Sequence, residues 1–192
     1  WIPAFAGMTP VESDDANNAS HPKPGLALPG ISLPATTGDT MCLADVPGTS
    51  VVFVYPWTGR PGHPNPPNWD DIPGAHGSTP EIEGFRDLYA AFRQLGILVF
   101  GLSYQTTDYQ REMTERLGVP FPILSDAAGR FAAALDLPSF ATGGTNYLKR
   151  LTFIVEAGHI EHVFFPVPEP ETHAGEVLHW LEQEGAGRRT GA

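Results

Sequence analysis

The chain has 192 residues, which corresponds to about one domain plus tails. Its 22 acidic and 11 basic side chains give a formal net charge of −11, and such an acidic surface repels nucleic acid and anionic membranes. No apolar stretch approaches the roughly 20 residues that span a bilayer, and the N-terminus lacks the basic and apolar segments of a secretory signal. The sequence therefore predicts no nucleic-acid partner and no membrane partner.

The sequence contains a single cysteine, Cys42, so that no intrachain disulfide and no all-cysteine metal site can form. This favours a reducing compartment, and we expect a cytoplasmic protein. Cys42 stands between Met41 and Leu43. We interpret it as a small buried packing residue rather than a redox partner.

Two polar segments flank the expected domain. Residues 11–25 are rich in Asp, Asn, Ser and Pro and have no apolar periodicity, so residues 1–25 are interpreted as a flexible N-terminal tail. Residues 185–192 form a second polar tail. The domain is therefore expected to span residues 26–184.

Within this domain, β-branched apolar runs predict buried strands, and apolar residues at three- and four-residue steps predict helices. In chain order we expect an edge element at 26–33, a strand at 51–55, one helix with apolar positions from Ile82 to Leu95 that ends at Gly96, a strand at 97–103, a helix at 107–117, a strand at 121–124, a helical turn at 131–137, strands at 148–155 and 159–165 around an Ala157-Gly158 turn, and a helix at 172–184.

Strands that alternate with helices predict an α/β fold with a mixed central sheet and helices on both faces. In such sheets, sites form where the C-terminal end of a strand leads into a loop and a helix, which here is the junction from Tyr55 to Pro80. Six prolines in residues 56–77 exclude a regular helix or a central strand. Irregular loops of this length are usually functional. Trp57 and Trp69 are expected to pack this loop down or to line an apolar entrance.

Ser78 stands at the start of the helix that follows the loop, and it has two interpretations. Pro80 suits the first helical position, and Ser78 with Glu81 matches a capping box in which the serine only caps the helix. The same place puts a side chain beside free backbone N–H groups and the positive end of the helix dipole, where a thiol loses its proton readily. A serine hydroxyl gains far less, because it is a weak nucleophile without an adjacent base.

The segment from Gly77 to Asp87 reads Gly-Ser-Thr-Pro-Glu-Ile-Glu-Gly-Phe-Arg-Asp. It resembles the active-site helix of peroxiredoxins of the bacterioferritin-comigratory type, in which the pattern is Gly-Cys-Thr-Pro-Glu-x-Cys-Gly-Phe-Arg-Asp. The Tyr55-Pro56 and Leu102-Ser103 pairs and the segments 117–126 and 150–155 resemble further family motifs in the same order. The resemblance covers about residues 26–181.

This resemblance implies a thioredoxin-like fold and thiol-dependent reduction of hydrogen peroxide or organic hydroperoxides. It implies no cofactor and no metal, and an external thiol reductant such as the thioredoxin or glutathione system as a partner. Family members occur as monomers and as dimers, so a homodimer stays open.

The resemblance also implies roles for individual residues. Position 78 corresponds to the attacking cysteine, and Arg150 would hold the thiolate and polarise the peroxide. Pro56 and Thr58 correspond to the proline and threonine that precede this cysteine, with Thr58 as a hydrogen-bond partner of the peroxide. Position 83 corresponds to the resolving cysteine, and Glu83 implies an active form with one catalytic cysteine that an outside thiol recycles. Without the resemblance, Arg150 also fits a strand residue paired with a carboxylate.

Ser78 departs from the family pattern, so the chain as it stands is expected to be inactive as a peroxidase. An introduced Cys-to-Ser change and a natural loss of the cysteine both account for it, and the otherwise complete motif favours the first. The segment 59–77 is an insertion, since the family's proline and threonine stand directly before the cysteine. The alternative function is a non-catalytic thioredoxin-fold binding module. A Ser-His-Asp hydrolase is disfavoured, because Ser78 has no Gly-x-Ser-x-Gly elbow.

The histidines give weak signals. His159 and His162 are three apart in an expected strand and face opposite sides, which disfavours a shared metal. His63 and His76 lie in the long loop with Asp70. A zinc site needs three or four converging ligands, so we interpret these loop residues as facing solvent.

Overall fold

A mixed sheet of five strands stands at the centre of the computed structural model, which describes residues 20–190. The strand order is β5-β4-β3-β8-β9. The β3–β4 and β4–β5 pairs are parallel, whereas the β3–β8 and β8–β9 pairs are antiparallel. The strands are β3 (Thr49–Val54), β4 (Leu98–Ser103), β5 (Ile123–Ser125), β8 (Leu151–Glu156) and β9 (His159–Phe164).

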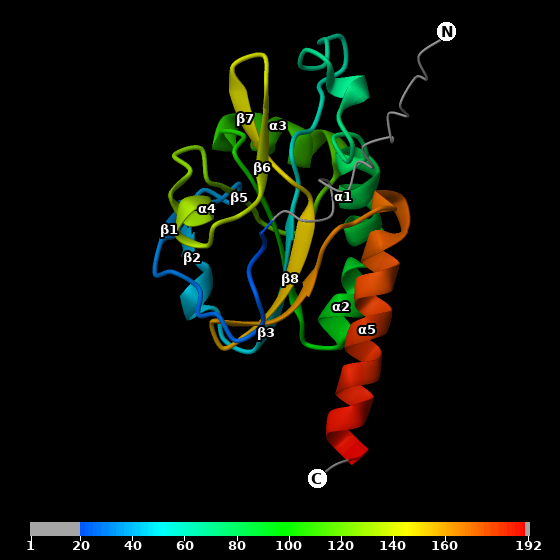
Figure 1. Cartoon of the computed structure of the whole chain (residues 1–192). Coiled ribbons are helices and arrows are strands. Elements are labelled where there is room, and N and C mark those ends of the chain that lie inside the picture. The colour runs from blue at the N-terminus through cyan, green and yellow to red at the C-terminus, as the bar shows by residue number, and fades with distance from the viewer. Residues whose placement is uncertain (1–19, 191–192) are drawn as a thin grey trace, which may run out of the picture.

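Helices cover both faces of this sheet, which confirms the predicted fold class (Figure 1). Side chains of β3 alternate between the faces, with Val51 and Phe53 on one side and Val52 and Val54 on the other. Because both faces are covered, β3 is apolar along its length. The Val51 and Phe53 face packs against α1 (Ser78–Asp87), α2 (Tyr89–Gln94), α3 (Thr107–Leu117) and α5 (Pro170–Thr190).

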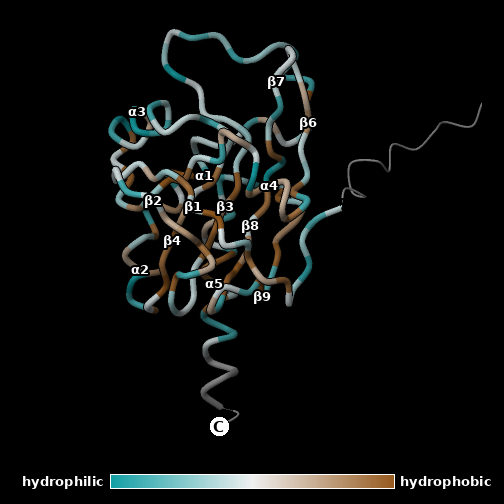
Figure 2. The backbone as a smooth tube through the Cα atoms, turned by 90° about the vertical axis from the view of Figure 1, so that its left-hand side faces the viewer, coloured by the Kyte–Doolittle hydropathy of each residue, from teal (hydrophilic) through white to brown (hydrophobic). Residues whose placement is uncertain are grey.

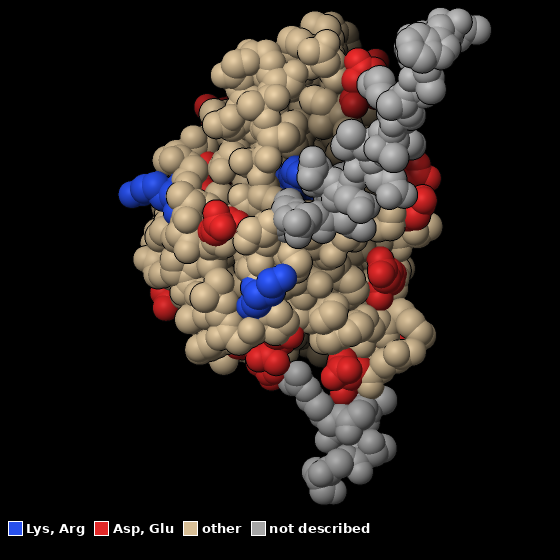
Figure 3. All heavy atoms as spheres, viewed as in Figure 1, with Lys and Arg blue, Asp and Glu red and all other residues tan. Residues whose placement is uncertain are grey.

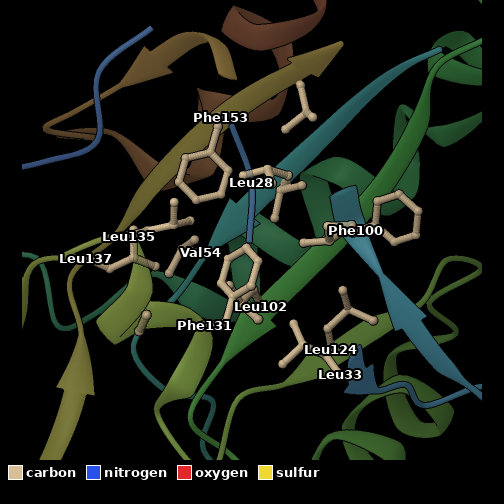
Figure 4. Close-up of a cluster of buried hydrophobic side chains, with 14 of the residues drawn as sticks. Leu28, Leu33, Val54, Phe100, Leu102, Leu124, Phe131, Leu135, Leu137 and Phe153 are labelled. Carbon is tan, nitrogen blue, oxygen red and sulfur yellow. The ribbon is translucent and has the colours of Figure 1, made fainter. Parts of the chain in front are cut away.

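The opposite face packs against α4 (Arg130–Ala134) and a two-stranded sheet of β1 (Ser32–Pro34) and β2 (Thr40–Cys42). Figure 4 shows this cluster, in which Phe131 lies beside Leu102 and Leu33 lies beside Leu124 of the central sheet. Along the chain, hydrophobic residues concentrate in the central strands and hydrophilic ones in the outer loops (Figure 2). Within residues 20–190, no helix combines the length and apolarity needed to cross a bilayer.

The single helix expected to end at Gly96 is in fact two helices, so that prediction is wrong. The chain leaves helical geometry at Leu88, where φ is −93° and ψ is 1°, between α1 and α2. The bend lets Phe85 and Phe92 both reach the core, with ring centroids 5.8 Å apart, while Phe85 stacks on Phe53 at 4.4 Å. An apolar period alone does not reveal the bend, because the same residues face the core in both arrangements.

A second hairpin, β6 (Ser139–Thr142) and β7 (Thr145–Leu148), was not predicted. Its turn is Gly143-Gly144, with φ values of 57° and 76°, a conformation that favours glycine at both positions. The hairpin leaves the predicted strand 148–155 to begin only at residue 151. Lys149 and Arg150 therefore lie between two strands rather than within one.

The β6–β7 hairpin packs against the long loop. As predicted, this loop is irregular, apart from the short helix η3 (Trp69–Asp71). Trp69 is buried, with ring centroids 5.7 Å from Phe140 and 4.9 Å from Tyr147. The hydroxyl of Thr142 donates a hydrogen bond to the carbonyl of Pro67. The insertion is thus held in one place by side chains that lie about 70 residues later in the chain.

Cys42 and the chain ends differ in detail from the expectations. Cys42 is half-buried in β2 rather than fully buried, a position followed by the short helix η2 (Leu43–Asp45). Most of the expected N-terminal tail lies outside the described residues, but the Gly25 N–H donates to the carbonyl of Ile160 at 2.7 Å. α5 continues to Thr190, through most of the segment 185–192. The domain limits 26–184 stay a prediction.

Gly101 of β4 offers a test of the tightly packed helical face. A Cβ at this position would lie 2.5 Å from Ile123 Cδ1 and 2.8 Å from Phe53 Cζ. Gly101→Ala is therefore expected to lower the free energy of unfolding by about 1–3 kcal/mol through overpacking, measured by urea denaturation. Gly30→Ala is the matched control, since a Cβ there meets nothing within 4 Å. Equal stability of the two variants would contradict the packing seen here.

Candidate functional site

The site begins where the long loop enters α1. Gly77 is the N-cap residue, with φ 100°, and a Cβ there would lie 2.6 Å from Pro170 Cγ, so the position requires glycine. Ser78 is the first residue of α1 and is 3% exposed. It therefore lies among the backbone N–H groups at the positive end of the helix, as the sequence predicts.

The capping-box interpretation of Ser78 and Glu81 is wrong. No side chain caps the N-terminus of α1, and Pro80 is the third helical residue rather than the first. The backbone N–H of Glu81 donates to the carbonyl of Gly77 at 3.0 Å, and its carboxylate accepts from Arg150 instead of from the backbone at the N-cap. The three-residue spacing of Ser78 and Glu81 allows a capping box, but Glu81 forms an ion pair with Arg150 instead.

Arg150 is the centre of the site and reaches it from the segment before β8. Its Nη2 donates to Ser78 Oγ at 3.1 Å, to the carbonyl of His76 at 2.9 Å and to the carbonyl of Gly74 at 3.4 Å. Its Nη1 donates to a carboxylate oxygen of Glu81. The side chains of Arg150 and Glu81 are 2% and 0% exposed, so both charges are withdrawn from water. Arg150 thereby ties the loop, the start of α1 and the carboxylate into one buried unit.

Burial makes Glu81 a group that titrates near neutrality. Desolvation raises its pKa from 4.5 to about 7, against the opposing effect of the Arg150 charge. Its second oxygen, Oε1, is buried and has no hydrogen-bond partner among the described residues. The carboxylate is thus costly to keep ionised without Arg150.

This pKa predicts a pH dependence of stability. Between pH 4.5 and about 7, the folded chain holds a proton on Glu81 that the unfolded chain has released. The stability from this group is therefore complete below pH 4.5 and is lost as the pH rises through 7, by an amount on the order of 1–3 kcal/mol. Urea unfolding between pH 4 and pH 8 measures this loss as a slope of the unfolding free energy against pH. Glu81→Gln is expected to remove that slope. Glu83→Gln, on the same helix but 40% exposed, is the control that keeps the slope. An equal slope in both variants would contradict the assignment.

A cavity of about 280 Å³ opens at Ser78. Trp57, Asn65 and Trp69 of the long loop line one part of it, and the Trp57 and Trp69 ring centroids are 5.4 Å apart. The residues from Ala75 to Pro80 line the rest. The sequence left two roles open for the tryptophans, packing of the loop or lining of an entrance, and Trp69 is buried while both rings line this cavity. Asn65 was missed, because its position depends on how the insertion folds back.

Thr58 and Pro56 lie elsewhere. The Thr58 hydroxyl donates to Gln105 Oε1 at 3.1 Å, and the Thr58 carbonyl accepts from Gln105 Nε2 at 3.1 Å and from the Tyr109 hydroxyl at 3.0 Å. Pro56 lines a separate cavity beside Gln105 and Tyr109. The structure therefore brings Arg150 to Ser78 but leaves Thr58 and Pro56 outside the cavity at Ser78.

The remaining candidates face solvent. Glu83 lies on α1, 3.7 Å from Arg86. His76 Nε2 pairs with Asp70 at 2.8 Å, and their side chains are 56% and 84% exposed. Because the ring of His76 engages Asp70 while Ser78 accepts from Arg150, a serine–histidine relay is not formed in the described structure. Within residues 20–190, no group of three or more potential ligands is placed to hold a metal ion.

The fold and the site together define a class of protein. A mixed sheet with helices on both faces, whose central strand β3 leads through the long loop into the N-terminal end of α1, describes a thioredoxin-like domain. The chain belongs to the Redoxin family, whose model matches residues 23–178. Its relatives are peroxiredoxins of the bacterioferritin-comigratory type, as the following comparisons show.

Two bacterial proteins illustrate the similarity in sequence. Putative peroxiredoxin bcp of Coxiella burnetii is 25% identical over 160 residues, covering 80% of this chain and 95% of that protein. Peroxiredoxin Bcp of Escherichia coli K12 is 27% identical over 166 residues, covering 84% and 96%. The chain thus matches nearly the whole length of both relatives.

Solved structures agree with the fold. Peroxidoxin BcpB from Mycobacterium tuberculosis is similar with a TM-score of 0.69 and 26% identity, covering 85% of this chain and 98% of that one. A cysteine-to-serine mutant of PrxQ from Xylella fastidiosa gives a TM-score of 0.71 at 23% identity, covering 86% and 99%. The predicted thioredoxin-like fold is confirmed.

Proposed function

We propose that position 78 is the reacting position of a thiol peroxidase, and that the Ser78 form admits hydroperoxides without reducing them. The single observation that carries this proposal is the 3.1 Å hydrogen bond from Arg150 Nη2 to Ser78 Oγ at the start of α1. It aims a guanidinium and the N-terminal end of a helix at one side-chain atom, in a cavity large enough for a small organic molecule.

With sulfur at position 78, this geometry favours the thiolate. The sulfur attacks one peroxide oxygen, so that a sulfur–oxygen bond forms as the oxygen–oxygen bond breaks. The other oxygen leaves as hydroxide or alkoxide and takes a proton from solvent. Arg150 stabilises the charge that develops on both atoms through charge-assisted hydrogen bonds. The product on the enzyme is a sulfenic acid.

Recycling then depends on an external thiol. Position 83 carries glutamate, so α1 offers no resolving sulfur. Cys42 lies in β2, whose neighbours Met41 and Leu43 pack on the sheet face opposite α1. An outside thiol therefore attacks the sulfenic sulfur and releases water, and a second thiol reduces the resulting mixed disulfide. A reducing, cytoplasmic compartment suits this chemistry.

Ser78 itself lacks what a serine nucleophile needs. Its Oγ accepts a hydrogen bond from Arg150, which withdraws electron density, and the nearby His76 is paired with Asp70 instead. Without an adjacent base, the hydroxyl stays protonated and unreactive. This is the observation that favours the second candidate function, a thioredoxin-fold module that binds its ligand without turnover.

The direct test compares the Ser78 chain with its Ser78→Cys and Ser78→Ala variants. Hydrogen peroxide and cumene hydroperoxide consumption is followed with dithiothreitol or the thioredoxin system as the reductant. Consumption by the Cys variant alone supports the peroxidase proposal. No gain over Ser78 would overturn it and favour the binding module.

A further inference from the structure

A second, larger cavity adjoins the site through Arg150. Its volume is about 480 Å³, within the range of small-molecule sites. Ile72 and Gly74 of the long loop border it, whereas the following residues of the same loop border the cavity at Ser78. Phe140 of β6 and residues 165–168 after β9 supply most of the remaining wall.

The only charged side chains that line this cavity among the described residues are Lys149 and Arg150. Lys149 is half-buried, and its ammonium has no ion pair or hydrogen bond with any residue of 20–190. Arg150 is 4% exposed, and its Nε–H is buried without a partner. Two cations with unused hydrogen-bonding capacity therefore border a mainly apolar space.

Lys149 differs from Lys23, Arg93 and Arg130, which also have no carboxylate partner among residues 20–190 but are exposed to solvent. Acidic side chains outnumber basic ones by 22 to 11, and Asp and Glu lie scattered over the face shown in Figure 3 while Lys and Arg are few. Arg60, Arg86, Arg111 and Arg116 all have carboxylate partners on the surface. Lys149 instead borders an apolar cavity that no carboxylate of the described residues lines.

We infer that this cavity binds an aliphatic monocarboxylate, with the carboxylate on Lys149 and the chain against Phe140, Phe165 and Val167. The one accessible cation, Lys149, matches the single negative charge of a carboxylate. A doubly charged phosphate would lose more hydration free energy against these apolar walls than its interaction with Lys149 would restore. The site lies beyond the peroxidase function proposed above. Its ligand borders the guanidinium that holds Ser78, so occupancy of the cavity is linked to the reacting position.

Isothermal titration of the full Ser78 chain with hexanoate, octanoate and decanoate tests this inference. We expect saturable one-site binding that tightens about two- to fourfold for each methylene that the cavity buries. 1-Decanol keeps the chain but lacks the charge, and it is expected to bind about fivefold more weakly than decanoate or worse. The absence of saturable binding, or equal affinity for decanol and decanoate, would overturn the inference.

Lys149→Gln isolates the proposed anchor and, at a half-buried loop position, leaves the core unchanged. It is expected to weaken decanoate binding about five- to tenfold while leaving decanol unaffected. Arg93→Gln, an exposed basic residue of α2 that lines neither cavity, is the matched control and is expected to bind like the parent. Equal decanoate affinity of both variants would exclude Lys149 as the anchor. The assay contains no peroxide, so its outcome is independent of the proposed peroxidase function.

Discussion

Ser78→Cys is expected to turn the chain into a hydroperoxide reductase at least about 10³-fold faster than the Ser78 and Ser78→Ala forms. The first turn of α1 and the Arg150 guanidinium both stabilise a negative charge at this side chain. They are expected to lower the pKa of the new thiol from about 8.5 by one to several units, so that most of it is thiolate at pH 7. Alkylation by iodoacetamide as a function of pH measures this pKa.

The position of the oxidised cysteine in the product shows which residue reacts with the peroxide. One equivalent of peroxide is expected to leave one sulfenic acid per chain, at position 78, which a dimedone adduct reveals by mass spectrometry. Cys42→Ser in the same background is the control, since Cys42 lies on the far side of the sheet and should not matter to the rate. A dimedone adduct on Cys42, or loss of activity in this control, would contradict the single-thiol mechanism.

The central strands were predictable because a strand that is buried on both faces has a continuous run of apolar residues in the sequence. β3 and β4 are short, continuous apolar runs, and α3 carries both its capping threonine and its terminating glycine in sequence. The expected helix at 107–117 coincides with α3, where the Thr106 hydroxyl accepts from the Tyr109 N–H and Gly118 adopts φ 65°. Each of these signals is local, so neighbouring residues suffice to read it.

The features that were missed depend on contacts between distant segments. The Glu81 carboxylate could cap its own helix or meet Arg150, and only the approach of the segment before β8 decides between them. The position of Asn65 follows from the docking of the insertion on β6 and β7 through Trp69. The family motif pointed to Arg150, but neither spacing nor composition could show that Thr58 turns toward Gln105 instead of Ser78.

Arg150→Met in the Ser78→Cys background is expected to lower kcat/KM for hydroperoxides by about 10²–10³-fold and to raise the pKa of the thiol. The methionine fills much of the same volume but donates no hydrogen bond to position 78. Arg150→Lys keeps the charge on a single nitrogen, which cannot reach Glu81 and Ser78 together as Nη1 and Nη2 of Arg150 do, so an intermediate rate is expected. Peroxide consumption and the alkylation profile measure both effects, and Arg86→Met, an arginine change elsewhere on α1, is the control.

The same substitution also removes the one partner that the Glu81 carboxylate has among residues 20–190, and this effect on stability must be separated from the effect on catalysis. Arg150→Met alone is expected to cost about 3–5 kcal/mol of unfolding free energy, because Glu81 is left buried and unpaired. Adding Glu81→Gln removes that charge and is expected to recover much of the stability but none of the activity. If the double variant instead regained both, the role of Arg150 would be to hold the fold, and the guanidinium would not act on the peroxide.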